Sequence, residues 1–346
     1  MTRRLQVAAS PTRVVLGAGA AALVGEELSR LGSARALVLS TNGRRSEADR
    51  IAAEIGERGA GVLAIAEEHV PVDVAVRGRA EAARVAADAL VAVGGGSTVG
   101  LAKAIALVHT VPIVAIPTTY SGSEMTPVFG LTDGGVKRTG RDERVRAACV
   151  LYDPLLSRDL PARVAVPSAF NALAHAVEAL YAPECDEAMR ELAEDSVRLL
   201  AGVLPALAAG SRELDVRERA LHGACLAGAC LGRASMGLHH KLAHVLGGTF
   251  GLPHAETHAA LLPHTARYNL AAAPAARVAL ARALGGEPVD ALVALVDATG
   301  VKRGLGALGL KRESLDHVAE LATAAPYPNP RPVTKDALVA LLEAAL

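Results

Sequence analysis

The sequence predicts an α/β nucleotide-binding domain followed by an all-helical domain. Over residues 1–157, short apolar runs alternate with helical stretches. Two of these runs lead into turns rich in glycine or hydroxyl side chains, and no clear two-residue alternation follows residue 157. Near-continuous apolar strands that alternate with helices are typical of a parallel, Rossmann-like sheet buried on both faces.

The order of the elements follows from these patterns. Strands are expected where short apolar runs occur, at 12–17, 35–41, 60–68, 90–97 and 112–119. Helices are expected where apolar residues recur at helical spacing, at 21–32, 47–55, 79–89 and 98–110. Pro154 and Pro161 mark the change of pattern, so the nucleotide-binding domain is placed at 1–157 and the helical domain at 158–346. A proline-rich loop at 325–333 precedes a last helix, whose expected N-cap is Thr334.

Composition excludes several classes of protein. Lys+Arg and Asp+Glu are equal at 36 each, so no basic surface for nucleic acid or anionic lipid is expected. The first residues show no charged stretch that leads into a long apolar one, and no apolar run reaches about 18 residues, so neither a secretory leader nor a membrane partner is expected. The four cysteines form no CxxC pair, which is typical of reduced thiols in the cytoplasm. The sequence therefore predicts a cytoplasmic protein.

The first motif is a glycine turn between a strand and a helix. It comprises Gly94, Gly95, Gly96, Ser97 and Thr98. Glycines let a ligand approach the backbone closely, and the start of the next helix offers N–H groups and a positive dipole end. These features fit a diphosphate, although a tight turn without a ligand would look the same.

The second motif, "IPTTYSGSE" at 116–124, is rich in hydroxyl groups that could bond phosphate, ribose or a nicotinamide amide: Thr118, Thr119, Ser121 and Ser123. Two such turns on one sheet favour a nucleotide site. An earlier "GAG" at 17–19 lacks the third glycine of a dinucleotide fingerprint. No acidic residue ends the strand at 35–41, which closes on Ser40, Thr41 and Asn42, so nothing there repels a 2′-phosphate. Either NADH or NADPH is therefore expected as the cofactor.

The third motif is a set of histidines in the helical half. Asn171 and His175 share a helix face, His240 and His244 are one turn apart, and His254 follows Pro253. His175, His240 and His254 with position 171 could bind a divalent metal such as iron or zinc. The neutral amide at 171 supplies no charge for a dication, so imidazoles that donate protons without a metal are the preferred interpretation. His239 and His258 are interpreted as solvated or packing residues, and ordinary helical histidines remain the alternative for all of them.

In this order, the motifs resemble the iron-dependent (group III) alcohol dehydrogenase superfamily, whose architecture is like that of dehydroquinate synthase. The resemblance is carried by 94–107, 116–127, 171–182, 238–259 and 329–333. Metal-dependent members usually carry Asp at the positions of Gly100 and Asn171, and a longer hydroxyl turn without Tyr120. This chain shares its departures with the maleylacetate reductase subfamily.

The resemblance implies NAD(P)H-dependent reduction of the carbon–carbon double bond of maleylacetate, an unsaturated dicarboxylic oxo-acid, to 3-oxoadipate in the catabolism of aromatic compounds. His175, His240, His244 and His254 are the candidate acids, with His244 preferred as the proton source. Tyr120 and Lys241 are candidates for binding the substrate carboxylates, and Lys137 for the cofactor ribose. The resemblance also implies a homodimer.

Other functions remain open. A metal-dependent alcohol dehydrogenase or aldehyde reductase would need bound iron or zinc, which Asn171 argues against. A dehydroquinate-synthase-like lyase would need an acidic ligand on the first helix of the helical domain and a basic cluster, and the sequence offers neither. A non-catalytic nucleotide-binding protein would not oxidise NADH. A homologue that acts on a related oxo-acid in biosynthesis would keep every motif, and Arg233, seven residues before His240, is either a surface residue or a determinant of substrate choice.

Overall fold

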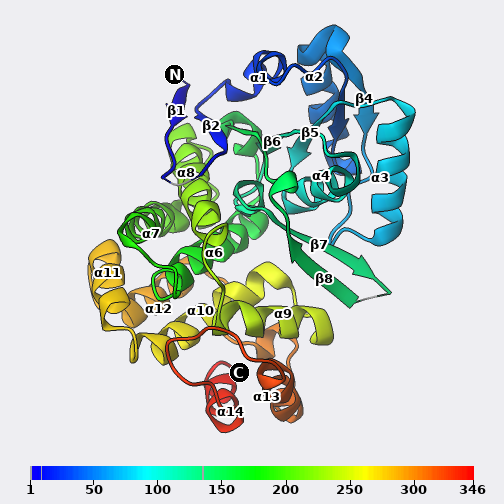
Figure 1. The fold of residues 1–346 in the computed structure, drawn as a ribbon. Helices are drawn as coiled ribbons and strands as arrows, with labels where there is room; N and C mark the ends of the chain where they lie inside the picture. Colours follow the sequence, from blue (N-terminus) through cyan, green and yellow to red (C-terminus); the bar gives the residue numbers. More distant parts are fainter. Residues whose placement is uncertain (1, 9, 135) are drawn as a thin grey trace. The chain divides into compact units, whose positions relative to one another are not determined.

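The computed structural model describes residues 2–8, 10–134 and 136–346. It divides into two compact units, Met1–Leu160 with Arg212–His222, and Pro161–Ser211 with Gly223–Leu346 (Figure 1). The segment Arg212–His222 therefore packs with the first unit although it follows the start of the second in the sequence. Among the described residues, no helix is long and apolar enough to cross a membrane.

The first unit is built on a seven-stranded sheet with the order β1-β2-β9-β6-β5-β3-β4. Every neighbouring pair is parallel except β1 with β2, so the expected parallel sheet is confirmed. The strands are β1 (Arg3–Leu5), β2 (Arg13–Leu16), β3 (Ala36–Leu39), β4 (Gly59–Leu63), β5 (Ala89–Gly94), β6 (Ile113–Pro117) and β9 (Cys149–Tyr152). Residues of β3, β5, β6 and β9 are buried throughout, which explains why they read as continuous apolar runs.

Four longer helices belong to the same unit: α1 (Val24–Arg30), α2 (Arg45–Ile55), α3 (Val72–Arg84) and α4 (Gly96–His109). The helix expected at 79–89 starts earlier and ends at Arg84, because Ala86 takes a left-handed backbone conformation (φ 48°) and closes the turn into β5. A short helix α5 (Pro154–Ser157) and a separate hairpin of β7 (Val128–Asp133) and β8 (Val136–Arg141) complete the unit. The sequence pattern predicted none of β1, β7, β8 and β9, which span three to six residues.

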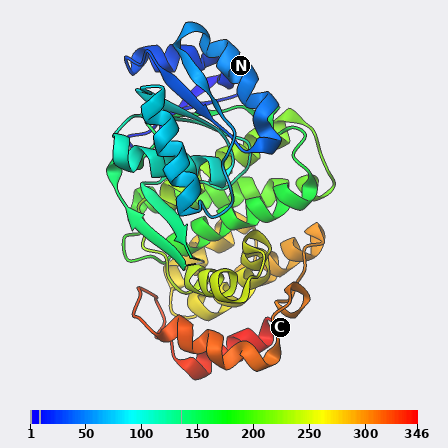
Figure 2. The same ribbon diagram turned by 90° about the vertical axis from the view of Figure 1, so that its right-hand side faces the viewer.

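The second unit is helical throughout, as expected, and residues 161–346 contain no strand. Its helices are α6 (Ala162–Ala179), α7 (Glu187–Ala208), α8 (Leu214–Leu231, whose first turns belong to the first unit), α9 (Leu238–Phe250), α10 (His254–Leu270), α11 (Pro274–Leu284), α12 (Pro288–Thr299), α13 (Leu315–Thr323) and α14 (Lys335–Ala344). Thr334 is the N-cap of α14, as expected, since its hydroxyl accepts a hydrogen bond from the Ala337 amide at 3.3 Å. Helices α13 and α14 lie side by side in both views and share an apolar core with α9 (Figure 2).

Candidate functional site

The two polar turns of the first unit lie against each other. Strands β5 and β6 pair in parallel register, with Gly94 opposite Pro117, and the Thr118 amide donates to the Gly94 carbonyl at 3.0 Å. A Cβ placed on Gly95 would lie 2.8 Å from Thr119 Oγ1, and one on Gly94 would overlap Thr98. Only glycine therefore fits at these two positions.

The glycine turn opens into α4, whose N-cap Gly95 has no side chain to cap the helix. The amides of the first turn of α4 are therefore available to a ligand with negative charge. Gly95, Gly96 and Ser97 are half-buried, as are Thr119, Ser121 and Ser123, whereas Gly94, Thr98 and Thr118 are buried. The backbone and hydroxyl groups of the half-buried set fit a phosphate-bearing cofactor, while the buried set shapes the turn.

A buried lysine of α4 forms hydrogen bonds with the hydroxyl-rich turn at 116–124 and with the residues that follow it. Lys103 of α4 is 1% exposed, and its Nζ donates to the carbonyls of Ser123 (2.7 Å) and Val128 (2.6 Å) and to the Thr126 hydroxyl (3.1 Å). Three acceptors require the three hydrogens of an ammonium group. Burial lowers the pKa of Lys103 to about 7, so a rise in pH through neutrality removes one of these three donors.

A buried glutamate holds the same turn from within. Glu124 is fully buried and accepts a hydrogen bond from the Tyr152 hydroxyl at 2.7 Å. Burial raises the pKa of Glu124, and the nearby Lys103 charge opposes that rise. The hydroxyl turn is therefore anchored by α4 through Lys103 and by β9 through Tyr152.

Tyr120, expected to bind a substrate carboxylate, is fully buried in the first unit. Arg217 at the start of α8 is also buried; its Nη1 donates to the Tyr120 hydroxyl (3.2 Å) and its Nη2 to the Leu160 carbonyl (3.2 Å). The role of Tyr120 toward substrate remains a prediction, and in this structure its hydroxyl faces Arg217. Lys137, expected near the cofactor ribose, lies on β8, and its side chain is outside the described part of the chain.

The expected histidines meet in the second unit. His175 of α6 stacks on His240 of α9, with ring centroids 4.8 Å apart, and His244 of α9 stacks on His254 of α10 at 5.9 Å. His175 and His240 are buried, His254 is half-buried and His244 is exposed. Lys241 of α9 is half-buried. One unit thus gathers all four candidate acids.

A buried carboxylate that the sequence analysis did not single out orients His240. Glu178 of α6 is 1% exposed and accepts a hydrogen bond from His240 Nδ1. It also accepts from the amides of His239 (2.8 Å) and His240 (3.3 Å), so it caps the positive end of α9. His240 Nε2 is buried and has no hydrogen-bond partner among the described residues.

His239 and His258, interpreted from the sequence as solvated or packing residues, are fully buried and hydrogen-bonded. His239 Nδ1 lies 2.8 Å from the Thr265 hydroxyl, and His239 Nε2 lies 2.8 Å from His258 Nδ1. His258 Nε2 lies 3.3 Å from His254 Nε2. Desolvation, together with the neighbouring imidazoles, lowers the pKa of both residues well below its ordinary value, so both are neutral.

These residues do not fit a metal ion well. Asn171 Oδ1, His175 Nδ1 and His240 Nε2 are buried without a hydrogen-bond partner, which a metal would relieve. Against this, position 171 offers no charge, and His254 Nε2 faces another imidazole nitrogen instead of an open position. Within the described residues, no three His, Cys, Asp or Glu side chains are arranged to hold a metal. The donor set therefore favours hydrogen bonding over coordination.

Arg233 takes part in the connection from α8 to α9. Its Nη2 donates to Asp186, the N-cap of α7, at 2.7 Å, and the next polar residue, Ser235, donates its amide to Glu184 at 3.0 Å. Arg233 thereby ties the loop before α9 to the loop before α7. In this structure Arg233 therefore connects two loops of the helical unit.

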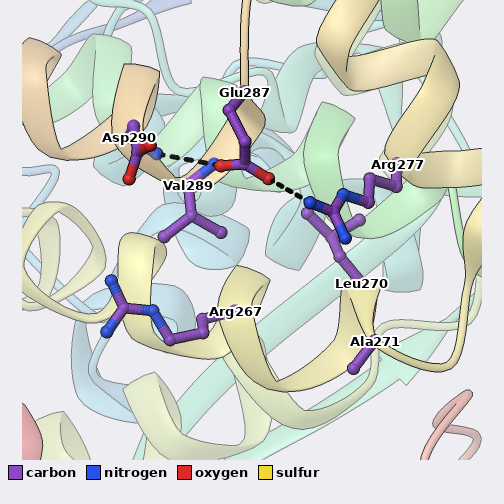
Figure 3. Close-up of a pocket in the computed structure, with 7 residues that line it drawn as sticks. All are labelled: Arg267, Leu270, Ala271, Arg277, Glu287, Val289 and Asp290. Carbon is purple, nitrogen blue, oxygen red and sulfur yellow. Dashed lines mark hydrogen bonds and ion pairs between the residues drawn. The ribbon is translucent and has the colours of Figure 1, made fainter.

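A shallow pocket of about 280 Å³ lies elsewhere in the second unit, beside α10, α11 and α12 (Figure 3). Arg267 and Arg277 line it, but Glu287 pairs with Arg277 at 2.9 Å and caps α12 through the amides of Val289 and Asp290. It contains none of the expected site residues. Glu287 neutralises Arg277 alone, and Arg267 lines the pocket without a salt bridge among the described residues.

Two of the residues that the sequence analysis missed had a visible signal. Glu178 follows His175 by three positions and Asn171 by seven, which places all three on one face of α6. Lys103 is the one charged residue in the apolar run 98–108. The bonds from His239 to Thr265 and His258 gave no such signal, because both partners lie on another helix, α10.

Comparisons with known proteins agree over nearly the whole chain. Residues 11–154 match the model of iron-containing alcohol dehydrogenases, and residues 165–346 match the C-terminal model of the same family. The chain is 50% identical over 334 residues to a maleylacetate reductase of Burkholderia cepacia, covering 96% of this chain and 95% of that protein. It is 51% identical to maleylacetate reductase 2 of Cupriavidus pinatubonensis over 340 residues, with 97% and 94% covered. The crystal structure of maleylacetate reductase from Agrobacterium tumefaciens superposes with a TM-score of 0.95 at 43% identity, with 99% and 98% covered.

Proposed function

We propose that the chain, which belongs to the iron-containing alcohol dehydrogenase family, acts on maleylacetate. The chain is an NAD(P)H-dependent oxidoreductase, and in this proposal it reduces the carbon–carbon double bond of maleylacetate to give 3-oxoadipate, in the degradation of aromatic compounds. Relatives that carry this name are 43–51% identical over more than nine-tenths of their length. We also propose a homodimer, on the family resemblance alone, and a cytoplasmic location, on the composition of the sequence.

The observation that carries the mechanism is the environment of His240. Its Nδ1 bonds the buried Glu178 carboxylate, and its Nε2 is buried without a partner among the described residues. A carboxylate on one ring nitrogen orients the imidazole and stabilises the positive charge that it carries when protonated. His240 Nε2 is therefore placed to give a hydrogen bond or a proton to a reacting group.

The reaction needs a hydride and a proton. NAD(P)H, when bound at the two turns of the first unit, supplies the hydride to a carbon that is conjugated with a carbonyl group. His240 stabilises the enolate that develops on the substrate, because a donor that meets developing charge lowers the barrier. His244, which is exposed and lies 6.3 Å from His240 between ring centroids, supplies the proton to the adjacent carbon. Lys241, half-buried on the same helix, binds a substrate carboxylate.

The metal-dependent alternative is the weaker one for this chain. An iron or zinc site would need His175, His240 and His254 with Asn171, and His254 Nε2 faces His258 instead. A Lewis acid is also not required by the proposed chemistry, because the carbonyl conjugated with the double bond already withdraws charge from it. We therefore propose catalysis without a metal.

The first test is an assay of the purified chain after treatment with a chelator. With maleylacetate as substrate, we expect oxidation of NADH, followed by its absorbance at 340 nm, at the same rate before and after chelation. Loss of activity that iron or zinc restores would contradict the metal-free mechanism. Absence of activity in both samples, while NADH still binds, would exclude maleylacetate as the substrate.

A second prediction concerns the choice between NADH and NADPH. Strand β3 is the neighbour of β5 in the sheet, so its carboxyl end lies beside the glycine turn, where a ribose would be recognised. That end carries Ser40, Thr41 and Asn42, and no carboxylate. We expect Thr41→Asp to raise KM for NADPH about tenfold, roughly 1.4 kcal/mol of repulsion, and to leave KM for NADH within twofold. Thr41→Asn is the uncharged control and should leave both values unchanged; an equal rise for both cofactors would exclude a 2′-phosphate site here.

A further inference from the structure

The buried histidine pair His239 and His258 has no part in the mechanism above, yet it lies at the centre of the cluster. The ring of His258 makes contacts with four other imidazoles: its centroid lies 4.9 Å from those of His239 and His240, 4.7 Å from that of His254 and 6.4 Å from that of His175. His258 belongs to α10, four residues after His254, so the two rings share one helix face.

The Thr265 hydroxyl, which bonds His239, sets which ring nitrogens of this pair donate and which accept hydrogen bonds. The Thr265 hydroxyl has a single hydrogen, which we assign to the carbonyl of Leu261 (3.1 Å) or Leu262 (3.2 Å) on the same helix. Its oxygen therefore accepts, and His239 Nδ1–H donates to it at 2.8 Å. A neutral imidazole carries one hydrogen, so His239 Nε2 is an acceptor.

Because each neutral imidazole carries one hydrogen, the same reasoning applies to His258 and then to His254. His258 Nδ1–H donates to His239 Nε2 at 2.8 Å, which leaves His258 Nε2 as an acceptor. His254 Nε2 then donates to it at 3.3 Å, so the hydrogen of His254 is held on Nε2. Three imidazoles thus take a single tautomeric arrangement, set by a buried threonine on α10.

We infer that His258 replaces a metal ion in this cluster: its ring lies between His240 and His254, and the Thr265–His239–His258 chain holds a hydrogen on His254 Nε2, which then has no lone pair for a cation. A metal held by both imidazoles would need the space of the His258 ring and an unprotonated His254 Nε2. His258 and His239 are therefore positioning residues. The inference deepens the proposed metal-free function and rests on it, but its test makes no use of the reaction.

The test compares the zinc content of three proteins. The wild type, His258→Ala and His264→Ala are freed of metal with a chelator, incubated with Zn²⁺ and dialysed, and zinc per chain is measured by atomic absorption. His264 is the matched control, because it is half-buried on the same helix and has no ring contact with the cluster in the described part of the chain. We expect about one zinc per chain for His258→Ala alone. Stoichiometric zinc in the wild type, or none in His258→Ala, would overturn the inference.

Two further measurements guard against a variant that does not fold. His258→Asn removes the ring but keeps an amide for His239, and it is also expected to gain zinc. Nitrogen NMR of wild-type protein with ¹⁵N-labelled histidine, assigned with His254→Asn, reads the tautomer directly, and a hydrogen on Nδ1 of His254 would contradict the inference. If maleylacetate is not the substrate, the 340 nm assay fails while the zinc and tautomer results stand, so the two failures are distinguishable.

Discussion

Replacement of Glu178 by Gln is expected to lower kcat for maleylacetate reduction about 100-fold, the lower end of what a positioned acid–base pair contributes. Glu178 is the carboxylate that meets His240 Nδ1 from the opposite helix. An amide in its place carries no negative charge, so a protonated His240 loses its partner in a buried site. The measurement is steady-state kinetics in which maleylacetate and NADH are varied in turn, which separates kcat from the KM for each.

The kinetic pattern separates this role from a purely structural one. Because Glu178 belongs to the second unit and the cofactor turns to the first, KM for NADH should stay within about twofold of the wild type. Glu178 also caps α9, so a loss of about 1–3 kcal/mol in unfolding free energy is expected as well. Glu184→Gln is the matched control, since Glu184 also accepts a backbone hydrogen bond near the start of α9 but bonds Ser235 and not an imidazole. If the Glu178→Gln enzyme has the wild-type kcat and a lowered melting temperature, Glu178 only caps α9 and has no role in catalysis.

The parts of the fold that the sequence predicted are those in which one pattern repeats. Strands β3, β5 and β6 are buried on both faces, so each appears as an uninterrupted apolar run, and α2 and α4 lie where helical spacing was seen. Strands β7 and β8 lie outside the main sheet, in a pair of their own, and are half-buried or exposed where described. Their sequence contains no long apolar run, so these two strands could not be predicted from the local sequence pattern.

The candidate site divides in the same way. Residues on one helix face can be related by counting, which is how Asn171 and His175 were paired, and Glu178 follows by the same count. The chain from Thr265 through His239 to His258 joins α9 to α10, and only the packing of the two helices brings these residues together. Spacing along the sequence does not reveal that His258 lies between His240 and His254. Tyr120 is a similar case, since its partner Arg217 is nearly a hundred residues away.

Replacement of Lys103 by Met is expected to destabilise the protein by about 2–5 kcal/mol and to raise KM for NADH about tenfold, with a smaller change in kcat. Methionine fits the volume of the lysine stem but leaves the carbonyls of Ser123 and Val128, both half-buried residues, without the lysine donor. These carbonyls belong to the turn that packs against Gly95 through Thr119, so a looser turn should weaken cofactor binding more than the later chemistry. Lys302→Met is the control, because Lys302 also donates to a carbonyl, that of Ala307 at 2.8 Å, but on the surface.

The pH dependence of stability tests the same residue by an independent route. Burial lowers the pKa of Lys103 to about 7 in the folded chain, below the unfolded value of 10.5. Between these two pH values the unfolded chain binds one proton more, so this lysine makes the unfolding free energy rise with pH, by at most about 1.4 kcal/mol per unit. The wild type should therefore gain stability relative to Lys103→Met between pH 7 and pH 10, measured by urea unfolding at each pH. Parallel curves for the two proteins would show that Lys103 keeps an ordinary pKa, and the lysine would then be a fixed cation that no neutral pH change can release from the turn.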